Sequence, residues 1–565
     1  MHELVRAARG GEPVDLALQN CLIFNPFLCE WEETALGIHG GRVLGPGMYR
    51  ARRVLDLGGR RVVPGYIDAH VHLESSLLSP FEYTRLAVLH GTTTIVADPH
   101  EISNVLGLSG IEYMLTCRPH LPIDLLLTLP SCVPATPKDL GGAVLGAEEL
   151  APLAGLEGVT GIGEVMNVTG LLTGDPDLVA KIWLLRTVDG HAPGLAGFDL
   201  NAYVLAGPQS DHEAVTPEEG RDRLARGMHL FLREGSTERN LAALLPVVTQ
   251  ATVPHCAFCT DDRHADLLMR AGGIDDCIRQ AVALGLEPEL ALRMATLSAV
   301  ERFGLNDRGA LTPGRRADFS VLDRGDEFRV ARTFVLGNEY IDRGPSRISV
   351  PSPARPIRCC LPVAGDLVPA VDGWVRVIEL VPGQIKTLAT EARVAAGTLP
   401  DTGRDLLPAA VCDAYRGLNT GIGIVHGFGL RAGALASTVA HDAHQVVAVG
   451  ADPEATAAAI RAVVASGGGL VALDRDRTTL LPLPIAGLMS DLPYGEVVEA
   501  LDRLAAHAES LGACANAFMH LSFLALTVIP ERRLTERGVF DYAPFQDQPL
   551  ALDGSVNAPQ DRNDC

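Results

Sequence analysis

The sequence predicts an α/β fold: a TIM-like (β/α)8 barrel with a small flanking β domain, plus a C-terminal mixed α/β domain. Over roughly 250 residues, strand-like apolar runs alternate with amphipathic helix-like stretches, as one parallel barrel requires. The strand-like runs are continuously apolar, because parallel strands in a barrel are covered on both faces. The chain of 565 residues also exceeds what one hydrophobic core usually holds, so we expect further domains around the barrel.

The barrel is expected at residues 61–305. Within it, "VVPGYIDAHVH" is followed by "PFEYTRLAVLHG", and "TTTIVADPH" is followed by "GLSGIEYMLTC". The runs "IDLLLTLPSCV", "VTGIGEVMN", "GMHLFLREG" and "PHCAFCTDD" continue the series of strands. Residues 1–60 and 306–350 are instead short apolar runs cut by Gly and Pro, so we expect them to pair in one composite β domain beside the barrel.

The chain after the barrel divides into three parts. The Pro-rich stretch "VPSPARPIRCCLP" at 350–362 indicates a linker. Residues 363–545 mix strand-like and helix-like runs and are expected to form the C-terminal α/β domain. Residues 546–565 are polar and are predicted to form a disordered tail.

Composition argues against several classes of partner. The chain has 47 Lys and Arg against 69 Asp and Glu, a formal net charge of −22, whereas nucleic acid and anionic membranes attract basic surfaces. We see neither an apolar run long enough for a membrane span nor the apolar core of a signal peptide. Scattered cysteines in a large chain favour free thiols in a reducing cytoplasm. The CxxC pair Cys256 and Cys259 is expected to be buried in a strand rather than to serve redox or zinc chemistry.

Ionisable residues follow the expected barrel strands in unusual number. Because a strand alternates its faces, His70 and His72 in "DAHVHLESS" point the same way and can converge on a metal ion. Catalytic groups of such barrels lie at the carboxyl ends of the strands. Buried ionisable groups in such number need a counter-charge, and a metal supplies it. The further candidates at later strand ends are Asp98, His100, Glu101, Glu164, His191, Asp211, His212, Glu213, Asp261 and Asp262.

This arrangement resembles the amidohydrolase superfamily, whose barrel carries His-x-His on strand 1, a bridging acid or carboxylated Lys on strand 4, His on strands 5 and 6, and Asp on strand 8. Position 164 is Glu, which points away from the hydantoinase and dihydroorotase branch. A closer resemblance, to the bacterial adenine deaminase family, covers about residues 12–545. It is carried by "ADPHEISNVLG", "DGHAPGL", "CTDDRH", "RMATLSAVERFGL", "GFGLRAGALASTVAHDAHQVVAVG" and "PLPIAGLMSD".

The resemblance implies a binuclear metal site that binds Mn(II) or Fe(II), with Zn(II) as a further possibility. His70, His72 and Asp261 would bind one ion. His191 and His212 would bind the other, with Glu164 between them. The implied activity is hydrolytic deamination of adenine to hypoxanthine and ammonia in purine salvage, by hydroxide held between the metals that attacks C6.

The resemblance assigns proton transfer less completely than metal binding. Asp261 is expected to pass the hydroxide proton to the departing amine. The acid that protonates N1 is left open among Glu74, Asp98, His100, Glu101 and Glu213, each of which could instead orient a metal ligand. Asp262 is expected to face the helix that follows its strand. Asp211 is a further candidate for support of a ligand or for contact with the substrate.

Other interpretations stay open at this point. Another metal-dependent amidohydrolase acting on a cyclic amide or related heterocycle would need the same ligands, because substrate loops decide the reaction. A catalytically dead scaffold is disfavoured, because the ligand set is complete. His441, Asp442 and His444 could form a second ion site, but a polar loop after a strand is favoured. The C-terminal domain could cover the barrel mouth or build the interface of an expected homodimer.

Overall fold

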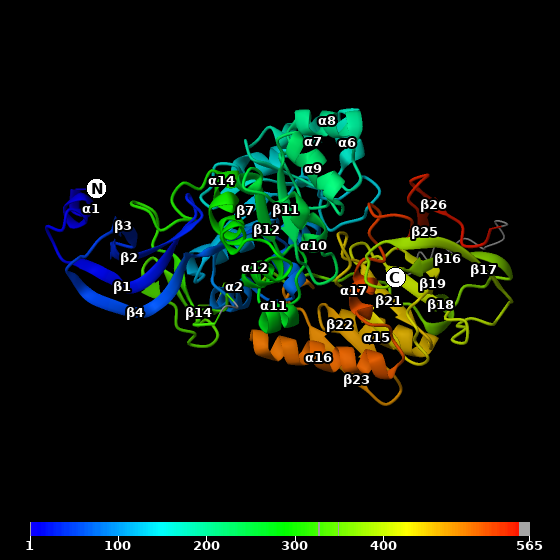
Figure 1. Ribbon diagram of the computed structural model, residues 1–565. Coiled ribbons are helices and arrows are strands. Elements are labelled where there is room, and N and C mark those ends of the chain that lie inside the picture. The colour runs from blue at the N-terminus through cyan, green and yellow to red at the C-terminus, as the bar shows by residue number, and fades with distance from the viewer. Residues whose placement is uncertain (1, 326–327, 349, 553–565) are drawn as a thin grey trace.

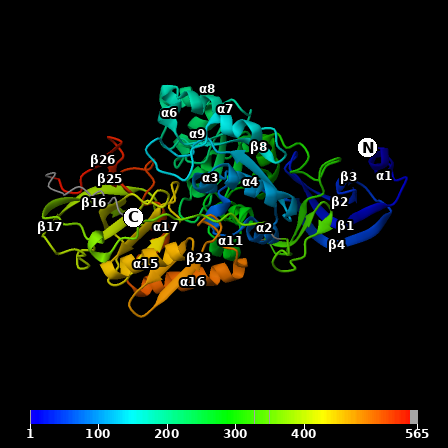
Figure 2. The same cartoon turned by 180° about the vertical axis from the view of Figure 1, so that it is seen from behind.

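The computed structural model describes residues 2–325, 328–348 and 350–552. Its three main parts lie in a row (Figure 1). A β sheet that contains the N-terminal strands lies at one end, the barrel lies in the middle, and the C-terminal strands lie at the other end. The view from behind shows the same order, so the barrel contacts both flanking parts (Figure 2).

The sheet at the N-terminal end draws strands from both sides of the barrel segment. Its strand order is β15-β14-β13-β4-β1-β2-β3. β13 (Phe319–Leu322) runs antiparallel to β4 (Ala51–Pro64), which runs parallel to β1 (Val14–Asn25). Its other strands are β2 (Glu30–His39), β3 (Arg42–Pro46), β14 (Val330–Val335) and β15 (Asn338–Glu339), and the short helix α1 (His2–Ala8) precedes them all. The exact limits of the domains stay predictions.

The barrel strands form two parallel sheets whose edges are joined by backbone hydrogen bonds. Gln209 N donates to Val188 O at 3.0 Å, which joins the two sheets, and Asp261 N donates to His70 O at 3.1 Å, which closes the ring. The result is the TIM-like curled parallel sheet that the sequence predicts. The strands are β5 (Tyr66–Val71), β6 (Thr92–Ala97), β7 (Asp124–Leu129), β8 (Val159–Val165) and β9 (Val188–Gly190), then β10 (Ser210–Asp211), β11 (His229–Arg233) and β12 (Cys256–Cys259).

Local sequence signals begin and orient the helices outside the barrel. Ser79 Oγ accepts the Glu82 N–H at 3.4 Å at the start of α2 (Pro80–Leu89), and Pro80 occupies its first position. α12 (Ile274–Ala283) buries apolar residues at i, i+3, i+4 and i+7, the face expected of an amphipathic helix. The remaining helices of the barrel are α3 (His100–Leu106), α4 (Leu108–Cys117), α5 (Ala147–Leu150), α6 (Val168–Thr173), α7 (Pro176–Ile182), α8 (Gly197–Ala206), α9 (Pro217–Ala225), α10 (Leu241–Leu244), α11 (Ala265–Ala271), α13 (Pro288–Arg293) and α14 (Ala299–Phe303).

The C-terminal part is built on an eight-stranded sheet with the order β17-β16-β19-β18-β21-β20-β22-β23. Backbone and side chain both connect it to the barrel, because Ser490 N donates to Leu77 O at 2.8 Å and Tyr494 N donates to Glu82 Oε2 at 2.9 Å. Its elements are β16 (Gly373–Leu380), β17 (Thr387–Val394), β18 (Leu407–Cys412), β19 (Thr420–His426), β20 (Ala434–Ser437), β21 (Val446–Gly450), α15 (Pro453–Ala465), β22 (Gly469–Leu473), β23 (Thr478–Pro482), α16 (Tyr494–Ser510), α17 (Ala517–Ser522), β24 (Arg532–Thr535), β25 (Gly538–Asp541) and β26 (Gln546–Gln548).

The prediction of a disordered tail from residue 546 is wrong for its first part. β26 pairs with β25, and Leu552 N donates to the carbonyl O of Trp374 in β16 at 3.0 Å. Polar side chains do not prevent this pairing, because the backbone supplies the hydrogen bonds and Leu550 is buried. Residues 553–565 of the predicted tail lie outside the described residues.

Two further predictions concern thiols and membranes. Cys256 and Cys259 are buried in β12 as free cysteines, as predicted, and burial raises the pKa of both thiols. The described part of the chain contains no helix with the length and apolar character needed to cross a membrane.

Gly163 generates a prediction about packing between β6 and β8. A Cβ at this position would lie 2.2 Å from Asp98 Oδ2, the atom that accepts the Glu164 N–H at 2.9 Å. Gly163→Ala should therefore displace the Asp98 carboxylate and lower the free energy of unfolding by about 1–3 kcal/mol, the usual cost of overpacking. A lower Tm in a thermal unfolding experiment would reveal the loss.

Gly155→Ala is the matched control for this substitution, because a Cβ at Gly155 would have no neighbouring atom within 4 Å. The explanation by overpacking fails if both variants change the Tm equally.

Candidate metal centre

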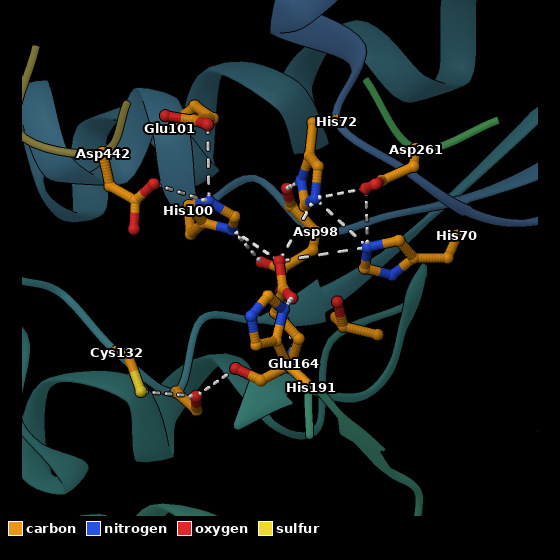
Figure 3. Close-up of polar contacts among 12 residues, drawn as sticks. His70, His72, Asp98, His100, Glu101, Cys132, Glu164, His191, Asp261 and Asp442 are labelled. Atoms are coloured by element: carbon orange, nitrogen blue, oxygen red, sulfur yellow. Dashed lines mark hydrogen bonds and ion pairs between the residues drawn. The ribbon is translucent and has the colours of Figure 1, made fainter. Parts of the chain in front are cut away.

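Imidazoles and carboxylates gather at the carboxyl ends of the barrel strands (Figure 3). His70 Nε2 and His72 Nε2 lie 3.1 Å apart at the end of β5. Asp261 Oδ1, which follows β12, lies 3.4 Å from His70 Nε2 and 3.1 Å from His72 Nε2. All three side chains are buried. The alternation of faces in β5 thus brings both imidazoles to one point, and closure of the barrel adds the carboxylate.

Glu164, in β8, faces two different pairs of imidazoles. Its Oε1 lies 3.2 Å from His72 Nε2 and 3.9 Å from His70 Nε2. Its Oε2 lies 2.6 Å from His191 Nδ1 and 3.3 Å from His212 Nε2. One carboxylate therefore reaches both halves of the cluster, which is the geometry needed to bridge two ions.

The neighbours of the two buried carboxylates hold them in the ionised form. Burial would raise the pKa of Glu164, but the imidazole of His191 and further hydrogen bonds hold it well below its usual range. Burial also opposes ionisation of Asp261, but the Arg233 guanidinium holds the pKa of that carboxyl well below its usual range. Arg233 Nη1 lies 2.6 Å from Asp261 Oδ2. Asp261 therefore has one oxygen toward the imidazoles and the other on a fixed cation.

The donor set fits divalent metal ions. Three groups of potential ligand atoms, each within 4.8 Å of one another, share members: His70, His212 and Asp261; His70, His72 and Glu164; Glu164, His191 and His212. His72 Nδ1 donates to Asp98 O at 3.1 Å, which leaves its Nε2 free to bind a metal. These groups contain imidazole and carboxylate but no thiolate, a combination that suits Mn, Fe or Zn better than soft metals.

His100 and its neighbours surround the ligand cluster. His100 Nδ1 lies 3.6 Å from both Asp98 Oδ1 and Glu164 Oε1. Glu74 Oε1 accepts the Ile102 N–H at 3.1 Å, and burial raises the pKa of Glu74 to about 7. The buried atoms His100 Nδ1, Asp98 Oδ1 and Glu74 Oε2 have no hydrogen-bond partner. Buried polar atoms are rarely left in this state, so the three mark a place where a polar ligand would complete the contacts.

Glu101 contacts the C-terminal domain rather than the ligand cluster. Figure 3 shows it on the far side of His100 from Glu164. His441 Nδ1 and His444 Nε2 each contact one of its carboxylate oxygens. Together these three side chains form another group that could hold a metal ion.

The prediction of an ordinary polar loop at His441 and His444 is therefore only half correct. Residues 438–445 do form a loop after β20, but every one of them is buried. The loop packs against α3 of the barrel, and the partners His441 and Glu101 are 340 residues apart in the chain. A contact between residues so far apart in the chain cannot be predicted from a local sequence pattern.

Asp211 and Glu213 support the second pair of imidazoles. Asp211 is buried, accepts Arg223 Nε at 2.9 Å and also accepts the Ala192 N–H at 3.1 Å, so it fixes the segment that carries His191. Glu213 Oε1 contacts Arg233 and lies 3.5 Å from His212 Nε2. Neither Asp211 nor Glu213 belongs to the three groups of potential ligand atoms described above.

Asp262 differs from the expectation that it faces the following helix. Its Oδ1 accepts a hydrogen bond from Ser75 Oγ at 2.5 Å. Ser75 follows His72 in the loop after β5, so Asp262 connects the two ends that close the barrel. His72, Asp261 and Asp262 are also close enough to count as one potential ligand group.

Arg233 escaped the sequence analysis, and the contact of Asp442 with the barrel was not foreseen. Arg233 ends the apolar run "MHLFLR" in β11, and a single cation at the end of a barrel strand is a signal that could have been used. Asp442 belongs to the C-terminal loop, where its Oδ1 lies 3.9 Å from His100 Nε2. Nothing around "AHDAH" indicates that this carboxylate reaches the barrel.

A cavity of about 540 Å³ lies between the barrel and the C-terminal domain. Ser131 and Cys132 line its barrel side, and Arg416 and Arg537 line the other side. Ser131 Oγ donates to Glu164 O at 2.5 Å. The wall of the cavity therefore touches the backbone of the residue that lies between the two pairs of imidazoles.

Comparison with known proteins agrees with this geometry. A model of the amidohydrolase family matches residues 61–340, and a model of the adenine deaminase C-terminal domain matches residues 385–546. An adenine deaminase of Methanoregula boonei is 54% identical over 97% of this chain and 98% of its own length. An adenine deaminase of Methanoculleus marisnigri is 57% identical over 91% of this chain and 99% of its own length. One of Desulfatibacillum aliphaticivorans is 42% identical over 96% of this chain and 98% of its own length.

The two family models meet at this site, because the barrel carries the ligand cluster and the C-terminal domain reaches it through His441, Asp442 and His444. The similarity therefore extends over both of the parts that build the centre. From this agreement and from the identity over nearly the whole length, the chain belongs to the adenine deaminase family of the amidohydrolase superfamily.

Proposed function

We propose that this chain hydrolyses adenine to hypoxanthine and ammonia, a reaction of purine salvage. The observation that carries the proposal is the position of Glu164 between two pairs of imidazoles, in a chain whose relatives are named adenine deaminase. Two divalent ions, Mn(II) or Fe(II) in preference to Zn(II), would supply hydroxide at neutral pH when bound.

The ligand roles follow from the distances. His70, His72 and Asp261 would hold one ion, because their donor atoms face one another across the seam of the barrel. His191 and His212 would hold the other, because both face Glu164 Oε2. A carboxylate with one oxygen toward each group would then hold both ions.

Asp261 is suited to move the proton. Hydrolysis requires a base to take a proton from the nucleophile and an acid to protonate the departing amine, since ammonia leaves poorly otherwise. Arg233 keeps Asp261 ionised before the reaction, as a base must be. The same carboxyl group can then return the proton to the amine.

The acid at N1 is best sought among the groups around His100. Asp98, His100 and Glu74 each have an unpartnered buried atom near the ligand cluster. Glu101 is less suited, because His441 and His444 contact its two oxygens. Glu213 is less suited as well, because Arg233 contacts it and lowers its pKa against the effect of burial.

The homodimer and the cytoplasmic location stay predictions. We retain both as proposals. For the location, the free thiols Cys256 and Cys259 suit a reducing compartment. Measurement of the molar mass in solution would test the dimer directly.

The purified protein supplied with Mn(II) or Fe(II) should release ammonia from adenine. It should use the free base in preference to adenosine. An assay of ammonia release on adenine, adenosine, guanine and cytosine, with hypoxanthine identified by chromatography, measures this. Faster turnover of adenosine, dihydroorotate or hydantoin would contradict the proposed function.

Glu164→Gln should lower the metal content of the purified protein together with its turnover. The amide keeps the shape of the side chain but removes the charge that two ions would share. Metal per chain is measured by plasma emission, and turnover by ammonia release. Glu82→Gln is the control, because Glu82 is a buried carboxylate that pairs with Arg85 away from the cluster. Two ions per chain and near-normal turnover in Glu164→Gln would remove Glu164 from the bridging position.

Asp261→Asn should fold and should lose turnover by roughly 10²–10⁴-fold, the effect of one general acid–base group. Its pH profile of kcat should also change, since a titrating group is gone. Asp262→Asn is the matched control and should be milder, because its Oδ1 already accepts a hydrogen bond from Ser75 Oγ. Measuring kcat and metal content side by side decides the matter. A larger loss from Asp262→Asn at full metal content would reverse the assignment of the pair.

A further inference from the structure

We propose that Asp442, from the C-terminal domain, binds the N–H of the five-membered ring of the purine and so selects the free base. The inference rests on the proposed function and extends it, because it adds a substrate-binding residue from outside the barrel. It follows from how the loop is held, from the state of the Asp442 carboxylate and from the chemistry of adenine.

The loop that carries Asp442 is fixed against the barrel on several sides. His441 and His444 contact the two oxygens of Glu101 in α3. Tyr415 Oη donates to Ala443 O at 2.7 Å, and Arg355 Nη2 donates to His444 O at 2.6 Å. A side chain on so constrained a loop has a defined position, as a group that recognises a substrate requires.

The ring of His441 adds a second constraint. It stacks on Phe523, with ring centroids 4.4 Å apart and an interplanar angle of 13°. His441 N also donates to Ser522 O at 2.9 Å. The barrel and the C-terminal domain thus hold the residue before Asp442 from opposite sides.

The Asp442 carboxylate lacks partners despite this rigid setting. It is 6% exposed, and its Oδ2 has no hydrogen-bond partner. Its ion-pair contact among the described residues is His100 Nε2, 3.9 Å from Oδ1. A ligand N–H would satisfy this oxygen.

The same domain contains a carboxylate in the opposite state. Asp405 accepts the Gly427 N–H at 2.7 Å and the Gly429 N–H at 2.9 Å, one on each oxygen. Asp405 therefore has a complete structural role without any ligand. The contrast indicates that the unpartnered oxygen of Asp442 is a property of its place at the barrel and not of carboxylates in this domain.

The position of Asp442 relative to the metal ligands selects the part of the purine that it can contact. His100 lies between them, with Nδ1 3.6 Å from Glu164 Oε1 and Nε2 3.9 Å from Asp442 Oδ1 (Figure 3). A substrate that has C6 at the ligand cluster and lies along the face of the His100 ring would extend its far ring toward Asp442.

Adenine offers two kinds of N–H donor: the 6-amino group, which must lie at the ligand cluster, and one ring nitrogen, N9 or its N7 tautomer. An ionised carboxylate only accepts hydrogen bonds, so Asp442 can pair only with the ring N–H. A nucleoside carries a sugar on N9 and would leave the buried oxygen without a donor. A site built to bind an N–H rejects analogues that lack it, because its own polar group is then unpaired.

The test uses Asp442→Ala, Asp442→Asn and the control Asp405→Asn in the full-length protein loaded with Mn(II). KM and kcat are measured for adenine, the inhibition constant is measured for 9-methyladenine, and metal per chain is measured for each variant. Removal of a hydrogen bond to a charged group should raise KM for adenine by about 10- to 100-fold in Asp442→Ala. The kcat should stay within about threefold, since the group binds and does not react.

The two ligands should respond differently. Asp442→Ala should leave the inhibition constant of 9-methyladenine unchanged or improve it, because that ligand has no N9–H to lose. Asp442→Asn should fall between wild type and Asp442→Ala, since its amide oxygen can still accept. The control Asp405→Asn should leave KM, the inhibition constant and metal content near their wild-type values.

Four results would overturn the inference. An unchanged KM for adenine in both Asp442 variants would show that the carboxylate does not bind substrate. An equal loss for adenine and 9-methyladenine, or a loss of metal from Asp442→Asn, would show that Asp442 only supports the structure. If the wild-type protein releases no ammonia from adenine, both the proposed function and the inference fail; normal wild-type turnover with unaffected variants removes the inference alone.

Discussion

The barrel mouth is organised around the buried carboxylate of Glu164. A carboxylate out of contact with water is costly unless its charge is met, and here imidazoles approach both of its oxygens. The same residue is fixed from below, because its N–H donates to Asp98 Oδ2 at 2.9 Å. That contact is possible only beside Gly163, where a Cβ would lie 2.2 Å from the accepting atom. In the sequence "GIGEV", the missing side chain of Gly163 thus leaves room for the Asp98 carboxylate that fixes the backbone of Glu164.

A second buried carboxylate, Glu101, extends this organisation to the C-terminal domain. Its contacts with His441 and His444 hold a loop of the C-terminal domain against α3. His100 precedes Glu101 in the chain and faces Glu164, so neighbouring residues serve the ligand cluster and the domain contact. The barrel therefore provides the ligands, while the closing surface comes from a separate domain.

Much of the fold and part of the site could be predicted from the sequence, for physical reasons that differ between residues. The strands β5 to β8 could be predicted because their residues are almost all buried and therefore apolar. His70 and His72 could be placed on one face because side chains of a strand alternate with a period of two. Asp442 could not be predicted, because its contact with the barrel depends on tertiary packing across the chain. Residues 546–552 were misjudged for a similar reason: pairing of backbone groups with β25 and β16 outweighs their polar composition.

The buried atoms without partners explain why these features occur together. Glu74 Oε2 and Asp98 Oδ1 follow β5 and β6, His100 Nδ1 belongs to α3, and Asp442 Oδ2 belongs to the C-terminal domain; all lie near the His100 ring or the ligands beside it. Each such atom costs free energy unless a ligand or water satisfies it. A protein that satisfied all four internally would leave no donor or acceptor for a polar substrate. The incomplete hydrogen bonding at this point is therefore the condition for binding, and the dense ion pairs around it, such as Arg233 with Asp261, stabilise the fold against its cost.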